Sequence, residues 1–260
     1  MIVWLTILEG EKKMSTRVQI SINASVDELK ELAKCECSLT REQVPMHPNV
    51  SEEILRELSR DEDRYVRIAV VWSHKMTTEL LDIMAEDGDE AVRAAVAANK
   101  KTSSKALTKL SKEKEWPTLR EVARNSNTPL EIVYNLADSV NYLVDDGVLQ
   151  NPNVTDEIIL KLTTVSRNPA IVREILKRDS LPQAVFDIFA GHYHEDVRLM
   201  VASDIRTQDK SLAILAKDWI PSIRLAVATN PNASKDTLFI LFADPDSKIH
   251  EAASKRLAQM

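Results

Sequence analysis

The chain has 260 residues, of which 44% are hydrophobic and 28% are charged, as in an ordinary globular protein. Its four glycines, Gly10, Gly88, Gly147 and Gly191, are far apart, which excludes a glycine-rich phosphate-binding loop. The net charge is −6 and the pI is about 5.5. Nucleic-acid binding needs a basic excess to meet the phosphates, so this balance disfavours nucleic acid as the main partner.

Cysteine content and hydropathy indicate the cellular compartment of the protein. The two cysteines, Cys35 and Cys37, lie two residues apart and cannot join distant parts of the fold. Such usage is typical of a reducing compartment, and we predict a cytoplasmic protein. No apolar run approaches the length of a transmembrane helix, so we predict no membrane association.

Residues 1–20 form a predicted N-terminal arm. The apolar segment 2–8 lacks a basic flank and a small-residue cleavage site, which makes it a poor signal peptide. Residues 9–11 read Glu-Gly-Glu, which a purine run resembling a bacterial ribosome-binding site can encode, just ahead of Met14. One interpretation therefore places residues 1–13 upstream of a native start at Met14. The other treats them as an ordered arm.

A polar residue recurs along the chain in steps of 26 residues, with a last step of 27. It stands at Ser21, His47, Ser73, Asn99, Asn125, Asn151, Lys177, Ser203 and Asn230. Such self-similarity is the sequence sign of a repeat architecture. We predict about nine repeats that fill residues 21–260 as a single domain.

A predicted N-cap follows in most repeats and begins a first helix. The caps are Ser25, Ser51, Thr77, Ser103, Thr155, Thr207 and Ser234, with Thr128 one place early. Their hydroxyls can accept from free amides of the first helical turn. Glu28 and Glu131 complete two predicted capping boxes. In the repeat without such a cap, Pro182 can begin the helix.

Each repeat continues with an apolar pair three residues apart, an acidic turn and a second helix. Leu55 with Leu58 is one such pair, and residues 61–63 are one such turn. The second helix carries an arginine between two apolar residues, as in Val66-Arg67 followed by Val70. One helix pair cannot bury its own apolar face, so neighbours must stack. We predict an all-α, right-handed α-α superhelix with polar end helices.

The repeated pattern Asn-Pro-Asn-x-[Ser/Thr]-x-x-x-Leu-x-x-Leu-x-x-Asp-x-Asp-x-x-Val-Arg-x-x-Val-Ala resembles the leucine-rich repeat variant family of bacterial HEAT-like helical repeats. The resemblance spans about residues 21–260. It implies an interaction scaffold without general catalytic activity. A founding type also carries an N-terminal iron–sulfur cluster, which needs more cysteines than this chain has. No cofactor is expected.

Arginines recur at one predicted position of the second helix. They are Arg41, Arg67, Arg93, Arg120, Arg173, Arg198 and Arg224, with Asp145 and His250 as exceptions. One interpretation is structural, with each guanidinium forked onto the acidic turn or the carbonyls of a neighbouring repeat. The other is a concave binding surface for an anionic partner. That surface would comprise Arg67, Arg93, Arg120, Asp145, Asp146, Arg173, Arg198 and Arg224.

Three further features allow both a functional and a structural interpretation. Residues 145–147, Asp-Asp-Gly, are either an acidic spot or kink in a groove, or simple decay of the repeat. A semi-apolar groove or ordinary packing explains Tyr65, Ile68, Val71, Trp72, Tyr142, Leu199 and Leu225. The segment 192–196, His-Tyr-His-Glu-Asp, is half a metal site or a solvated turn, and a complete site needs more ligands.

The leading function hypothesis is a non-enzymatic scaffold that binds a protein or peptide partner on its concave face. An alternative is nucleic-acid binding in the manner of HEAT-like alkylpurine DNA glycosylases, which use arginine, tryptophan and aspartate. Trp72, Trp116 and Trp219 with the arginines motivate it. A third class is a lyase or hydroxylase on HEAT-like repeats. No catalytic residue can be nominated.

Overall fold

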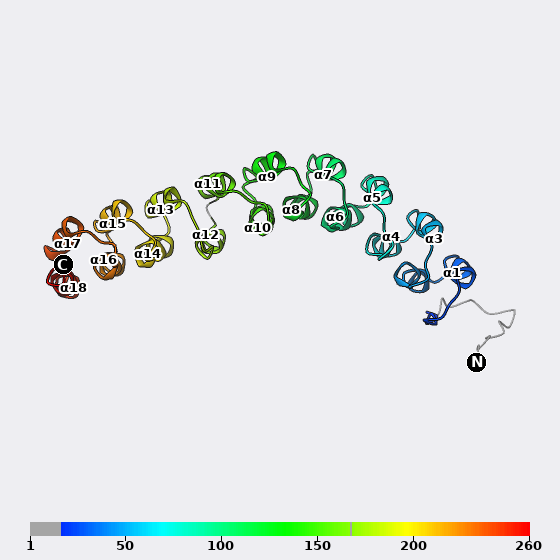
Figure 1. Ribbon diagram of the computed structural model, residues 1–260, viewed down its shortest axis with the longest axis horizontal. Helices are drawn as coiled ribbons and strands as arrows, with labels where there is room; N and C mark the ends of the chain where they lie inside the picture. The colour runs from blue at the N-terminus through cyan, green and yellow to red at the C-terminus, as the bar shows by residue number, and fades with distance from the viewer. Residues whose placement is uncertain (1–16, 167) are drawn as a thin grey trace. The chain divides into compact units, whose positions relative to one another are not determined.

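The computed structural model describes residues 17–166 and 168–260, and every regular element in that part of the chain is helical. The question of a native start at Met14 lies outside the described residues. The helices alternate along the chain as the predicted first and second helices of nine repeats (Figure 1). The predicted α-solenoid is therefore confirmed. The chain divides into two compact units, one ending at Glu113 and one beginning at Lys114.

The first unit contains four first helices and three second helices, and a short 3-10 helix extends the earliest second helix. Its elements are α1 (Val26–Leu32), α2 (Ser38–Arg41), η1 (Val44–Met46), α3 (Glu52–Leu58), α4 (Arg64–Val71), α5 (Thr78–Met84), α6 (Glu90–Ala98) and α7 (Ser104–Leu110). Odd-numbered helices form one row and even-numbered helices form the other (Figure 1). We call these the first-helix row and the second-helix row.

The second unit begins with a second helix and continues the alternation. Its helices are α8 (Trp116–Arg124), α9 (Leu130–Leu136), α10 (Tyr142–Gln150), α11 (Asp156–Val165), α12 (Pro169–Leu176), α13 (Gln183–Ala190), α14 (Glu195–Ser203), α15 (Asp209–Leu215), α16 (Pro221–Thr229), α17 (Lys235–Phe242) and α18 (Ser247–Leu257). Here too the even-numbered helices lie in one row (Figure 1). None of the helices built from described residues is long and apolar enough to cross a bilayer.

Side-chain caps begin most first helices as the sequence predicts. Ser25 and Glu28 form the full capping box, and Ser51, Thr77, Ser103, Thr155 and Ser234 each accept from a first-turn amide. The predicted caps Thr128 and Thr207 are wrong. Their helices begin one residue later, after Pro129 and Gln208. Both hydroxyls turn back and donate to carbonyls of the preceding second helix, those of Val122 and Val201.

The core lies between the two rows and passes from repeat to repeat. Leu55, Leu81 and Leu107 from the first helices are fully buried, as are Val66 and Val92 from the second helices. Burial of a side chain of this size contributes about 1.5–3 kcal/mol. The contacts repeat between neighbours, so stability accumulates along the stack.

The recurring asparagine ties each repeat to the one before it. The side-chain amide of Asn99 donates to the carbonyl of Val71, and that of Asn230 donates to the carbonyl of Ala202. Asn151 makes the same bond to Ala123. Each acceptor lies 28 residues earlier, at the end of the preceding second helix. These bonds satisfy helix-end carbonyls that the helix itself leaves without donors.

Candidate functional site

Most predicted ladder arginines bridge two successive turns. Arg67 donates from Nε and Nη2 to both carboxylate oxygens of Asp87, at 2.8 and 2.9 Å. Its Nη1 reaches back to the carbonyl of Asp61 at 2.8 Å. The fork is bidentate and shielded, since the side chains are only 14% and 9% exposed. We call such an arginine with its carboxylate a rung.

The described residues contain five rungs, each joining an arginine to a carboxylate 20 residues later. They are Arg41–Asp61, Arg67–Asp87 and Arg93–Glu113 in the first unit, and Arg198–Asp218 and Arg224–Asp244 in the second. Every rung arginine also donates to the carbonyl six residues before it. The hydrogen bonds from Arg224 hold the pKa of Asp244 below its usual range.

The acidic turns have two separate tasks within this geometry. Asp87 accepts the arginine fork and also the amide of Asp89. Asp89 in turn is the N-cap of α6 and accepts the amide of Ala91. Of the two acids in each such turn, which are separated by one residue, the first therefore pairs with the rung arginine and the second caps the following helix.

The sequence predicts that all seven arginines occupy the same position of the second helix. That prediction is wrong for two of them, Arg120 and Arg173. Rung arginines lie four residues after the N-cap of a second helix, as Arg93 does after Asp89. In α8 and α12 that position is occupied by Leu119 and Val172, which are buried. Arg120 and Arg173 lie one residue further on. Their side chains are 32% and 52% exposed.

These two arginines make different contacts from the rungs. Arg120 reaches Asp146 on α10 at 3.1 Å and its own neighbour Glu121 at 3.3 Å. Arg173 approaches Asp196 on α14 at 3.7 Å. The helix turns about 100° per residue, so a shift of one position moves the guanidinium out of the turn and onto the helix surface.

Both partners of a rung change together in the second unit. Rung carboxylates stand two residues before an N-cap, as Asp87 does before Asp89. Residues at the arginine and carboxylate positions of the altered rungs are Leu119 with Ser139, Asp145 with Ser166, and Val172 with His192. An unpaired buried charge is costly, so a carboxylate at this position is destabilising once the arginine that pairs with it is lost. Three successive altered rungs therefore separate Arg93–Glu113 from Arg198–Asp218 along the sequence.

Asp145 occupies an arginine position, but it is not the surface acidic spot that the sequence suggested. It is 2% exposed, and its Oδ1 has no hydrogen-bond partner. Burial raises the pKa of Asp145, and an interaction with Ser166 partly offsets the rise. Asp146 is nearer the surface and accepts from Arg120 and Gln150. The segment lies within α10, between Asn141 and Asn151.

Gly147 allows α10 to approach α8 closely. A Cβ at this position would lie 2.4 Å from the carbonyl oxygen of Arg120 and 3.2 Å from the Cβ of Ala123. The first distance is far below van der Waals contact, so only glycine fits here without movement of the helices.

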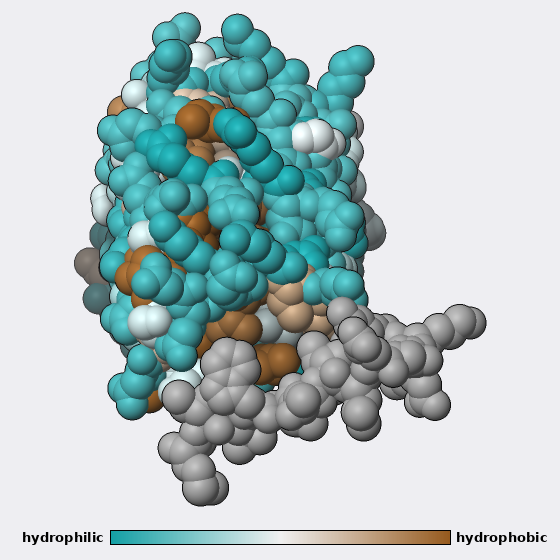
Figure 2. All heavy atoms as spheres, turned by 90° about the vertical axis from the view of Figure 1, so that its right-hand side faces the viewer, coloured by the Kyte–Doolittle hydropathy of each residue, from teal (hydrophilic) through white to brown (hydrophobic). Residues whose placement is uncertain are grey.

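Large apolar side chains gather on the second-helix row of the first unit. Tyr65 and Trp72 on α4 are 55% and 48% exposed, and Ile68 lies half-buried between them. Leu39 and Met46 occupy the equivalent positions on α2 and η1, both of which pack on α4. We call these five residues the aromatic patch. Figure 2 shows a surface that is mostly hydrophilic, with apolar side chains among the polar ones.

The neighbouring helix α6 continues the aromatic patch with small residues. Ala91, Ala94, Ala95 and Ala98 lie at the positions that Tyr65, Ile68, Ala69 and Trp72 occupy on α4. Arg64 stands at the rim, with its guanidinium 4.9 Å from the centre of the Tyr65 ring. The surface therefore combines two exposed rings, a low alanine face and one cation.

The groove predicted from the sequence is partly corrected. Val71 is fully buried and belongs to the core. Tyr142 is 58% exposed, but Leu199 and Leu225 are half-buried. Leu39 and Met46 were missed, and the signal that finds them is their repeat position, two and nine residues after the N-cap. In the second unit the positions matching Trp72 are polar, namely Arg124, Gln150, Lys177, Ser203, Thr229 and Lys255.

The remaining candidates do not converge on one site. The rings of His192, Tyr193 and His194 lie together: His192 stacks on Tyr193, with ring centres 4.6 Å apart, and the Tyr193 and His194 rings are tilted by 49°. Within the described residues, no three metal-ligating side chains are placed to hold an ion. Trp116 begins α8 and is 45% exposed. Trp219 is 75% exposed, and its ring centre lies 5.9 Å from the Arg198 guanidinium.

Comparisons with known proteins bear on the fold. No family model matches the chain, and no curated protein matches it. Among solved structures it is similar to one described as a leucine-rich repeat variant with a novel repetitive protein structural motif. The TM-score is 0.58 at 22% identity, covering 91% of this chain and 89% of the other. The predicted resemblance to the leucine-rich repeat variants is thus confirmed at the level of the fold.

Proposed function

We propose that this protein is a non-enzymatic interaction scaffold that binds a protein or peptide partner through the aromatic patch. One observation carries the proposal. Four large apolar side chains in register, Leu39, Met46, Tyr65 and Trp72, are about half exposed on adjoining second helices. Contiguous apolar surface of this kind marks interaction sites, and exposed tyrosine and tryptophan often dominate binding energy.

The alanine face of α6 favours a partner segment that is itself a helix or a strand. Side chains of one carbon leave room beside Trp72 and Tyr65 for the backbone of an incoming helix or strand. An amphipathic helix would place apolar residues spaced three and four apart against the rings. Arg64 at the rim lies 3.7 Å from Asp89 and is 49% exposed, so this long, exposed ion pair can be exchanged for an acidic residue of the partner at little cost.

The rungs weigh against nucleic acid as the partner. Arg67 and Arg198 are bound to Asp87 and Asp218, so their charges are already neutralised. A phosphate would have to displace a bidentate carboxylate in a shielded turn, which costs more than binding an available cation. The predicted concave location of the binding face remains a prediction.

Site-specific photo-crosslinking tests the proposal. A photoreactive phenylalanine analogue at Tyr65 or Trp72, in cells that naturally express the gene, should give adducts of the same defined mass. The matched control is Ile83, which is 54% exposed on α5 in the first-helix row. Nuclease-sensitive adducts, or steeply salt-dependent DNA binding by the purified chain, would instead favour the glycosylase-type alternative. Adducts of equal yield from Ile83 would refute the aromatic patch as the site.

A further inference from the structure

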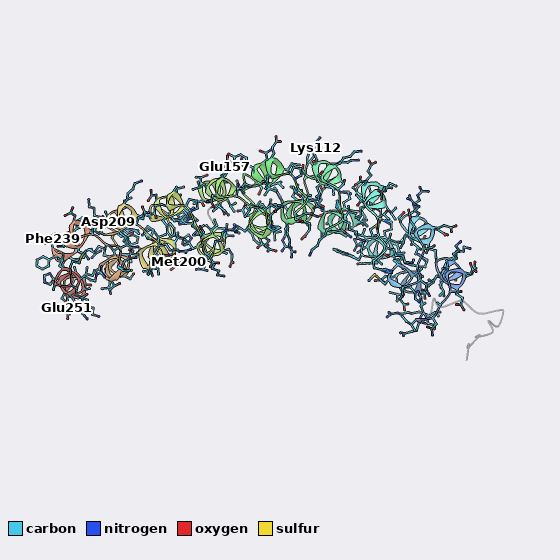
Figure 3. All side chains as sticks on the ribbon, viewed as in Figure 1. Lys112, Glu157, Met200, Asp209, Phe239 and Glu251 are labelled. Carbon is cyan, nitrogen blue, oxygen red and sulfur yellow. The ribbon has the colours of Figure 1, made fainter. Side chains whose placement is uncertain are left out.

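The last repeat carries two phenylalanines at positions that face the next repeat elsewhere in the chain. These are the fifth and eighth residues after the N-cap of the first helix, occupied in α17 by Phe239 and Phe242. Phe239 is 59% exposed and Phe242 is 46% exposed. Figure 3 shows the Phe239 side chain directed away from the other helices, at the end of the row.

The eighth position is small in every other first helix. Its residues are Ala33, Ser59, Ala85, Ser111, Ala137, Thr163, Ala190 and Ala216. All are buried except Ser111, which is half-buried. A small side chain lets the next helix approach closely, so a phenylalanine here is incompatible with stacking an ordinary repeat.

The fifth position contacts the start of the following first helix. Lys30 pairs with Glu53 at 2.8 Å, and Asp187 pairs with Lys210 at 2.7 Å. Both partners lie two residues after the next N-cap. In the last repeat this polar contact is replaced by the Phe239 ring, which is poorly suited to an acidic or basic partner.

We propose that this end face, formed by Phe239, Phe242 and His250, docks on the same face of a second copy of the chain. His250 on α18 belongs to the face because its ring lies 4.6 Å from that of Phe242 and it bonds the Phe242 carbonyl at 2.5 Å. A two-fold contact brings identical aromatic surfaces together. It also covers apolar area that terminal repeats normally keep polar.

Charge distinguishes this arrangement from head-to-tail stacking. The positions of α1 that match Glu53 and its neighbour carry Asp27 and Glu28, both exposed. Stacking α1 on α17 would press carboxylates against phenyl rings, which costs desolvation without a paired charge. The end face instead has both signs at its rim, because Lys235 and Glu251 are exposed at positions that face the next repeat elsewhere. Lys235 matches Asp209, which accepts from the Ser234 amide of the next repeat, and Glu251 matches Arg173, which pairs with Asp196 of the next repeat. A two-fold axis can pair these opposite signs across the contact.

Sedimentation equilibrium of the full chain tests the proposal. We expect a reversible dimer, and at least a tenfold rise in its dissociation constant for Phe239→Ser combined with Phe242→Ser. Ile214→Ser is the matched control, because Ile214 is 51% exposed on α15 but faces outward, and it should dimerise like the wild type. A wild-type chain that stays monomeric at about 0.1 mM, a protein concentration at which weak interfaces associate, would overturn the proposal.

Crosslinking determines the symmetry of the contact. In a two-fold contact residue 242 approaches its own counterpart, so Phe242→Cys should give disulfide-linked dimers on mild oxidation. Ile214→Cys is the control, and both variants share the background of Cys35 and Cys37. Absence of linked dimers, or growth into open-ended polymers, would exclude the face-to-face arrangement. Neither result depends on the aromatic patch, so the proposed function is tested separately.

Discussion

A guanidinium held away from water between two turns differs energetically from one on the surface. Arg67 donates to Asp87 and to the carbonyl of Asp61. Its removal would leave the shielded Asp87 carboxylate with the Asp89 amide but without a counter-charge, and would take a donor from the Asp61 carbonyl. The cost comes mainly from these stranded groups, rather than from lost attraction. The rungs are therefore best understood as connectors between repeats.

Arg67→Ala should lower the free energy of unfolding by about 2–4 kcal/mol, because it strands the shielded Asp87 carboxylate. Arg56→Ala is the control, since Arg56 pairs with Glu52 on an exposed helix surface and should cost less than about 0.5 kcal/mol. Urea denaturation followed by circular dichroism measures both. Equal losses for the two variants would contradict a structural role for the rung.

Asp145 gives the opposite sign of electrostatic effect. Burial raises its pKa in the folded state, so the folded chain favours the protonated form. The contribution of Asp145 to stability is then greatest below the unfolded pKa, about 3.9, and is lost as pH rises through the higher folded pKa. Asp145→Asn should raise the Tm at neutral pH, and by less at acidic pH. A constant Tm difference between wild type and variant across pH would argue against this account.

At the scale of helices, α8 and α10 are the pair whose spacing depends most on one residue. Gly147→Ala gains helix propensity of about 1 kcal/mol but forces a methyl group onto the Arg120 carbonyl. Overpacking of this kind costs about 1–3 kcal/mol, and a 2.4 Å approach to backbone leaves little room to relax. We expect a net loss of about 1–2 kcal/mol.

Gly88 supplies the control for that change, because a Cβ there meets nothing within 4 Å. Gly88→Ala should stay within about 0.5 kcal/mol of the wild type. Chemical denaturation of both variants distinguishes close helix packing from a general intolerance of alanine. A Gly147→Ala variant as stable as the wild type would mean that α8 and α10 can separate without cost.

The helices and the repeat length were predictable, because the apolar periodicity recurs in every unit and a hydroxyl cap begins most of the first helices. The rung positions were only partly predictable. Arg120 and Arg173 follow their rung positions by one residue. From the sequence alone, an arginine displaced along its helix cannot be distinguished from an arginine in register after a loop that is one residue longer. One step of 26 residues from Arg93 gives Leu119 rather than Arg120, and counting four residues from the N-cap of α12 gives Val172 rather than Arg173.

The aromatic patch illustrates the other limit of prediction. Tyr65 and Trp72 attract notice in the sequence, but exposure decides whether they bind or pack. Val71 beside Trp72 is buried, since adjacent residues on a helix face directions about 100° apart. Leu39 and Met46 become visible only when all second helices are placed in one register. The identity of the partner is not encoded in that register at all.

For the whole molecule, the boundary after Glu113 has an energetic meaning. The three rungs of the first unit, from Arg41 to Glu113, are complete within it. Because stability in repeat proteins is a sum of repeat and nearest-neighbour terms, this part contains its own connections. The prediction that residues 21–260 form a single domain can therefore be tested by truncating the chain after Glu113.

A chain ending at Glu113 should fold by itself and unfold cooperatively, with a lower Tm than the full protein because fewer interfaces remain. Circular dichroism should show helix content in keeping with α1 to α7. A truncated chain without cooperative unfolding would show that the second unit is required to fold the first, as expected of one indivisible domain.

The rung spacing also has a consequence for how such a gene can change length. An arginine and its carboxylate lie 20 residues apart and belong to successive blocks of 26. Between Arg41 and Glu113, where the rungs are unbroken, unequal recombination that adds or removes one whole block returns every arginine to a carboxylate at the same distance, wherever the breakpoints fall. Lineages can thus lengthen or shorten the array in single genetic steps without passing through a protein that carries stranded charges.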